Sequence, residues 1–106
     1  MSKRYFYLEE SPYYPGKYGI YIDFDNLPPM KTTGSYNLLP ARLLGLSYAE
    51  YLRFCRDVYK AEIIGKNNMY PVAYFKNNIA AGDLIKMLNE RMAIVEYNCQ
   101  RSNECI

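Results

Sequence analysis

The sequence predicts an α+β fold, a small single domain in which short antiparallel β-hairpins pack against two α-helices. Its 106 residues, 50% apolar and 23% charged, have the composition of one globular domain. Two pairs of segments show β-strand character with turn residues between them, and two longer segments carry an apolar helical stripe. We expect an N-terminal hairpin (1–25), a loop and short helix (26–46), a helix-hairpin-helix unit (47–97) and a frayed tail (98–106).

The N-terminal hairpin is predicted from residues 4–8 and 18–25. The first segment is aromatic and β-prone, and the Pro and Gly residues after it interrupt the strand. In the second segment Ile20, Ile22 and Phe24 alternate with polar residues and Tyr, as expected of a half-buried strand. In the connection that follows, Pro40 suits the first turn of a short helix.

The helix-hairpin-helix unit begins with a capping box formed by Ser47 and Glu50. Its first helix runs to about residue 60, and residues 61–65 and 69–76 form the second hairpin. Pro71 lacks an N–H, so this strand should lie at a sheet edge. Asn77 or Asn78 can cap the second helix. The predicted core contains Ile20, Ile22, Phe24, Leu52, Cys55, Val58, Ile63, Val72, Leu84, Ile85, Leu88 and Met92.

The absence of His excludes His-based catalytic triads and His-ligated metals within the chain. Cys55, Cys99 and Cys105 lack the short spacing of structural zinc sites, and no cofactor is implied. Cys99 and Cys105 either remain free thiols or close a small loop on oxidation. No signal peptide or membrane-spanning run is present, which indicates a cytoplasmic protein.

Thirteen Tyr residues are the strongest functional signal. Three of them fall on the apolar face of the first long helix, but seven crowd the first 36 residues, more than a small domain can bury. Tyr offers a large contact area with a polar tip at modest ordering cost. A half-buried aromatic sheet and a partner-binding surface explain these residues equally well. The surface would contain Tyr5, Tyr7, Tyr18, Tyr21 and Tyr36.

A basic stripe offers a second site. Arg53, Arg56, Lys60 and Lys66 are candidates to grip the phosphates of single-stranded nucleic acid, with nearby Tyr stacking on bases. Interleaved Glu50 and Asp57 favour instead an ordinary solvated helix face.

An acidic group follows the second predicted strand. Asp23 and Asp25 lie one residue apart, so their oxygens could share Mg²⁺. The string from Tyr21 to Leu27 resembles the first strand of NYN/PIN-type nucleases, which implies a metal ligand at Asp23 supported by Asn26. The chain offers no matching later carboxylates, and an Asp-Asn turn explains the residues more simply.

Residues 39–53, with Ile63-Ile64-Gly65-Lys66-Asn67 and the segment 70–75, resemble small accessory proteins of Gram-positive phages and mobile elements. That resemblance implies a protein that binds and blocks a host protein, such as a CRISPR nuclease or another defence enzyme, in the host cytoplasm. We therefore expect a non-enzymatic inhibitor. A single-stranded nucleic-acid binder and a metal-dependent nuclease using Asp23 and Asp25 are the alternatives.

Overall fold

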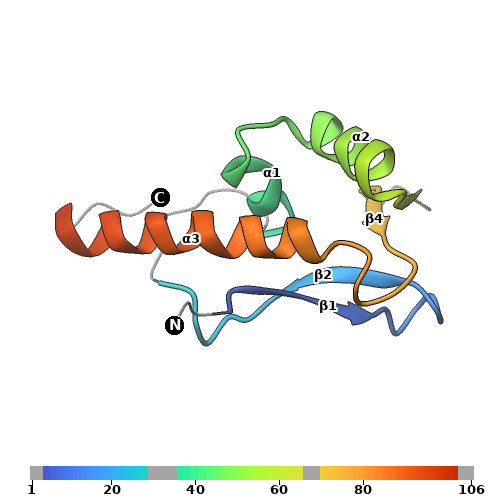
Figure 1. Cartoon of the computed structure of the whole chain (residues 1–106), viewed down its shortest axis with the longest axis horizontal. Coiled ribbons are helices and arrows are strands. Elements are labelled where there is room, and N and C mark those ends of the chain that lie inside the picture. The colour runs from blue at the N-terminus through green and yellow to red at the C-terminus, as the bar shows by residue number, and fades with distance from the viewer. Residues whose placement is uncertain (1–3, 29–35, 66–69, 103–106) are drawn as a thin grey trace.

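The fold is α+β, as the sequence predicts. The computed structural model describes residues 4–28, 36–65 and 70–102, and within these ranges it contains two antiparallel two-stranded sheets and three α-helices (Figure 1). In chain order the elements are β1 (Phe6–Glu10), β2 (Tyr18–Ile22), the 3-10 helix η1 (Tyr36–Leu38), α1 (Leu39–Leu43), α2 (Tyr48–Tyr59), β3 (Glu62–Ile64), β4 (Val72–Tyr74) and α3 (Gly82–Ser102).

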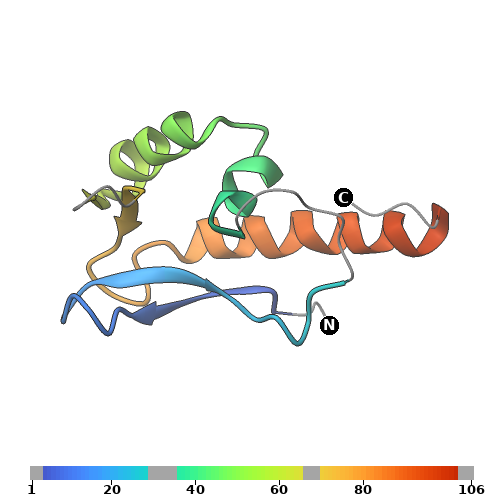
Figure 2. The same cartoon turned by 180° about the vertical axis from the view of Figure 1, so that it is seen from behind.

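Strands β1 and β2 form the predicted N-terminal hairpin. Their register pairs Phe6 with Ile22 at one end and Glu10 with Tyr18 at the other. The ladder continues past both ends, because the N–H of Ser11 donates to the carbonyl of Lys17 and the N–H of Asp23 donates to the carbonyl of Tyr5, each at 2.8 Å. The two views show this hairpin running along the long helix α3 (Figures 1 and 2).

Strands β3 and β4 form the predicted second hairpin, in which Ile63 pairs with Ala73. Strand β4 begins directly after Pro71, as expected for a residue that cannot donate to the ladder. Polar contacts join the hairpins. Tyr18 and Phe75 exchange backbone hydrogen bonds of 2.7 and 2.8 Å, and Lys17 and Glu62 form an ion pair of 2.6 Å.

The predicted signals for α1 and α2 are confirmed. Pro40 lies in the first turn of α1. The capping box of α2 is complete, because the Ser47 side chain accepts from the N–H of Glu50 and the Glu50 side chain accepts from the N–H of Ser47. Helix α2 ends at Lys60, whose φ of 59° is left-handed.

Helix α3 differs from the prediction at both ends. It begins at Gly82, and Asn77 instead organises a preceding turn by accepting from the N–H groups of Ile79 and Ala80. The helix continues to Ser102. Residues 98–102, which were predicted to belong to a frayed tail, are therefore helical. Residues 98–102 contain no Gly or Pro to end the helix. Residues 103–106 lie outside the described part of the chain.

The core lies where α3, β1, α2 and β4 meet. Leu52, Cys55, Leu84, Leu88 and Met92 are buried as predicted, and each apolar side chain buried in this way stabilises the fold by about 1.5–3 kcal/mol. Ile20, Ile22, Ile63 and Ile85 are partly buried against this core, and Val72 is half-buried.

Two predicted core residues are exposed. Phe24 is 59% exposed because β2 ends at Ile22 and the following turn removes it from the strand alternation. Val58 is 55% exposed because it lies at the margin of the apolar stripe of α2. Among the described residues, no helix is long and apolar enough to cross a membrane.

Candidate functional site

A groove opens between the outer edge of β2 and strand β4, with η1, α1 and the start of α2 completing its walls. Its volume is about 270 Å³. We call it the aromatic groove and define it by the residues that line it, which are Gly19, Ile20, Tyr21, Ile22, Phe24, Tyr36, Asn37, Pro40, Tyr48, Tyr51, Val72, Ala73 and Tyr74. These residues come from four separate parts of the chain.

Aromatic rings dominate the lining. Phe24 and Tyr36 meet edge to face with ring centroids 5.1 Å apart, and both side chains are exposed. On the opposite side Tyr48 and Tyr51 of α2 lie 6.0 Å apart. Such contacts hold the rings in place. Phe24 and Tyr36 remain exposed to a ligand, whereas Tyr51 is only 5% exposed.

Further tyrosines extend this aromatic surface beyond the lining. Tyr7 stacks on Tyr21 with centroids 6.1 Å apart, and Tyr14 meets Tyr74 edge to face at 5.2 Å. The Tyr74 ring lies against the backbone of Gly19. A Cβ placed at Gly19 would lie 3.5 Å from Cε1 of Tyr74, an ordinary van der Waals contact, so the ring packs directly over this residue.

The described residues that line the groove are uncharged, because none of them is Lys, Arg, Asp or Glu. Burial raises the pKa of the Tyr48 and Tyr51 hydroxyls, which therefore stay protonated at neutral pH. The Tyr48 hydroxyl donates to the carbonyl of Pro71 at 2.6 Å.

Beneath the groove, burial raises the pKa of the Cys55 thiol to about 11, so this core Cys is not a nucleophile at neutral pH.

The predicted partner-binding tyrosines are only partly brought together. Tyr21 and Tyr36 line the groove, and Tyr7 lies beside it through its stacking on Tyr21. Tyr18 is partly buried against the core at the end of the groove where β2 meets Phe75.

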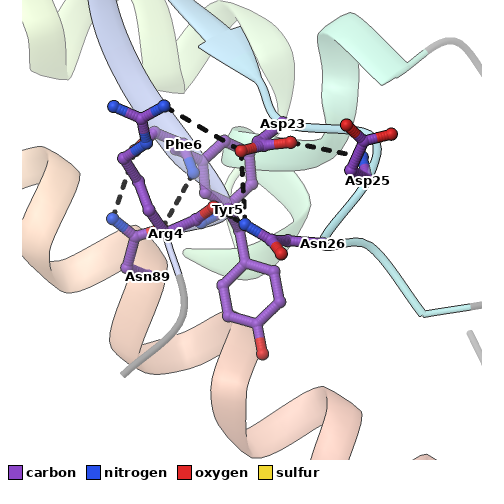
Figure 3. Close-up of polar contacts among 7 residues, drawn as sticks. All are labelled: Arg4, Tyr5, Phe6, Asp23, Asp25, Asn26 and Asn89. Carbon is purple, nitrogen blue, oxygen red and sulfur yellow. Dashed lines mark hydrogen bonds and ion pairs between the residues drawn. The ribbon is translucent and has the colours of Figure 1, made fainter. Parts of the chain in front are cut away.

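Tyr5 departs from the prediction, because its side chain is 1% exposed and cannot form part of a contact surface in this structure. Its hydroxyl donates to the buried carboxylate of Glu96 on α3. The backbone explains this position: the N–H groups of both Tyr5 and Phe6 donate to Oδ1 of Asn89, each at 2.8 Å (Figure 3). Consecutive N–H groups point in opposite directions in a regular strand, so the alternation breaks here and turns Tyr5 inward.

The acidic group after β2 forms a turn. The carboxylate of Asp23 accepts from the N–H of Asp25 at 3.2 Å and from the side-chain amide of Asn26 at 3.2 Å, with Arg4 3.9 Å away (Figure 3). The Asn26 amide also donates to the carbonyl of Arg4. These contacts match the Asp-Asn turn that the sequence offered as the simpler explanation.

No group of three or more His, Cys, Asp or Glu side chains lies close enough to hold a metal ion in the described residues. The side chain of Cys99 and all of Cys105 lie outside them, so the predicted alternatives for this pair stay open.

The basic residues that the structure describes on α2 and at its end do not line the groove. Arg53, Arg56 and Lys60 are exposed on α2, and Arg56 pairs with Asp57 at 3.0 Å. At 100° per residue, Arg53 lies on the side of the helix opposite Tyr51. Lys66 lies outside the described residues.

Comparison with family models, with curated proteins and with solved structures finds no match to this chain. The function is therefore inferred from the chemistry of the groove. Sequence reasoning treated Tyr48 and Tyr51 as helix core and gave Gly19 and Tyr74 no role in binding. The only sequence signal for Gly19 is a Gly inside a strand pattern, which often marks a close approach of another group.

Proposed function

We propose that this chain is a small non-enzymatic binding protein that holds a segment of a partner protein in the aromatic groove. The observation that carries this proposal is the meeting of six aromatic side chains around one open groove, whose described lining residues are uncharged. Aromatic residues, and Tyr in particular, contribute large contact areas to protein interfaces with few rotatable bonds to order.

The charge distribution favours a protein segment over single-stranded nucleic acid. Proteins that bind single strands combine stacking rings with Lys and Arg along the same groove. Here none of the described lining residues is a cation, and Arg53 lies on the opposite side of α2 from Tyr51. A basic stripe and a set of stacking rings on different faces do not act on the same strand.

The proposed biological role is inhibition of a host defence protein in the host cytoplasm. It draws on the resemblance of residues 38–92 to small phage accessory proteins. A binding groove without catalytic groups suits this role, because an inhibitor of this kind acts by occupying a surface that the host protein needs.

The test is selection of a random peptide library displayed on yeast against the immobilised full-length chain. We expect the wild-type chain to enrich one family of sequences. We expect the double variant Tyr21→Ser, Tyr36→Ser to bind them at least about tenfold more weakly, since aromatic anchors commonly contribute more than 1–2 kcal/mol each. Tyr13→Ser is the matched control, because Tyr13 is 82% exposed and does not line the groove.

Two results would contradict the proposal. One is a selection that enriches no peptide family. The other is binding of single-stranded oligonucleotides that falls steeply with salt and is lost when Arg53 and Lys60 are replaced, which would favour the nucleic-acid alternative.

A further inference from the structure

The outer edge of β2 presents backbone hydrogen-bonding groups to the groove. In an antiparallel pair, the N–H and C=O of every second residue point away from the partner strand. Tyr18 is one such residue, because both of its backbone groups bond to Phe75 rather than to β1. By the same alternation, Ile20 and Ile22 direct their N–H and C=O groups to the outer edge, where both residues line the groove.

Strand β4 presents a matching group from the other wall. Phe75 directs its N–H and C=O toward β2, so Ala73, two residues earlier, does the same. In a continued ladder Ala73 would pair with Ile20. No backbone hydrogen bond joins them, although both are described, because β2 and β4 diverge beyond the Tyr18–Phe75 bridge.

We propose that the partner segment binds as an added β-strand, pairing its backbone with β2 at Ile20 and Ile22. This inference rests on the proposed function and names its binding mode. Strand addition obtains its affinity from main-chain hydrogen bonds and its specificity from side-chain pockets on alternate positions. The groove supplies both. Among the described residues no backbone hydrogen bond is made from the outer edge of β2 at Ile20 and Ile22, and aromatic side chains line the groove beside that edge.

The occupant is an extended segment with uncharged apolar or aromatic side chains at alternate positions. The uncharged lining would leave a buried Lys or Glu of the segment without a partner, which is costly. A second copy of this chain fits less well. Its own β2 edge is recessed beside β4 in the same way, and two recessed edges cannot approach each other as two flat sheet edges do.

The probe is an array of capped ten-residue peptides in which Val or Tyr alternates with Thr. The strongest binder is then resynthesised with one N-methyl group at a time along its backbone. We expect N-methylation to weaken binding by about tenfold at alternate positions and by less than about twofold between them, since only every second N–H faces β2.

The readout on the protein is the ¹⁵N spectrum of the full-length chain with and without the unmethylated peptide. The amides of Ile20 and Ile22 should shift and exchange more slowly in the complex, while Tyr13 stays unchanged. Strand addition would be overturned if N-methylation at every position left binding unchanged and the Ile20 and Ile22 amides were unaffected by the peptide. The proposed function would remain intact in that case if the Tyr21→Ser, Tyr36→Ser variant still lost binding. If the Ile20 and Ile22 amides exchanged more slowly as the protein concentration rose in the absence of peptide, the occupant would be a second copy of the chain, and the proposed partner segment would be overturned.

Discussion

The two edges of the N-terminal hairpin differ in how their backbone groups are satisfied. At the edge of β1, Asn89 of α3 accepts from the N–H groups of Tyr5 and Phe6 and donates to the carbonyl of Phe6 at 3.2 Å (Figure 3). At the edge of β2, one backbone bridge to Phe75 is followed by a groove lined with aromatic rings. Sheet edges are normally covered or blunted because they invite pairing with other chains. The β1 edge is thus committed to the fold at Tyr5 and Phe6, and we infer that the β2 edge at Ile20 and Ile22 is kept for a partner.

Removing the cover of the β1 edge should have the largest effect on stability. Asn89→Leu keeps the side-chain size but removes three hydrogen bonds to Tyr5 and Phe6. We expect the free energy of unfolding to fall by about 2–4 kcal/mol, because two backbone N–H groups next to the core lose their acceptor. Urea denaturation measures the change.

Asn78→Ala is the control for this substitution, because Asn78 is exposed before α3. It should change the free energy of unfolding by less than about 0.5 kcal/mol. Equal effects of Asn78→Ala and Asn89→Leu would show that the β1 edge does not depend on Asn89.

A smaller effect is expected at the buried contact between Tyr5 and Glu96, which also joins β1 to α3. Burial, followed by the hydrogen bond to Glu96, raises the pKa of Tyr5 to about 12 from its ordinary value of 10. Tyr5→Phe removes a donor to a buried carboxylate and should cost about 1–3 kcal/mol at neutral pH.

The same contact predicts a pH dependence. Because the folded pKa of Tyr5 is raised, its contribution to stability is fully present below pH 10 and is lost as the pH rises from 10 to about 12. The difference in unfolding free energy between wild type and Tyr5→Phe should therefore shrink over that window. Urea titrations at a series of pH values measure it, with the exposed Tyr13→Phe as control. A difference that stays constant to pH 12 would contradict this assignment.

The fold was predictable where local chemistry determines it. Ser47 and Glu50 indicate the start of α2, and the alternation in residues 18–22 indicates β2, because caps and strand periodicity depend on neighbouring residues. The prediction failed where the position of a side chain depends on a turn or on a packing partner. Phe24 continues the alternation of Ile20 and Ile22 in the sequence, but the turn at Asp23 ends it in space.

The candidate site was less predictable. Tyr21 and Tyr36 were expected to face a partner, but the groove also needs Gly19 and, from distant parts of the sequence, Tyr48 and Tyr74. Its existence depends on the divergence of β2 from β4, a long-range feature without a local pattern. The sequence did not indicate the role of Asn89 at the β1 edge either, because a single polar residue on a helix is usually solvated.

The most direct test of the difference between the two edges is amide hydrogen exchange of the free full-length chain. The N–H of Phe6 is bonded to Asn89, and that of Tyr21 points inward to β1, so both should be protected. The N–H groups of Ile20 and Ile22 point to the groove and should exchange at least about a hundredfold faster, since exchange there needs no opening of the ladder. Equal protection of Ile20, Ile22, Phe6 and Tyr21 would contradict an edge kept open for a partner strand.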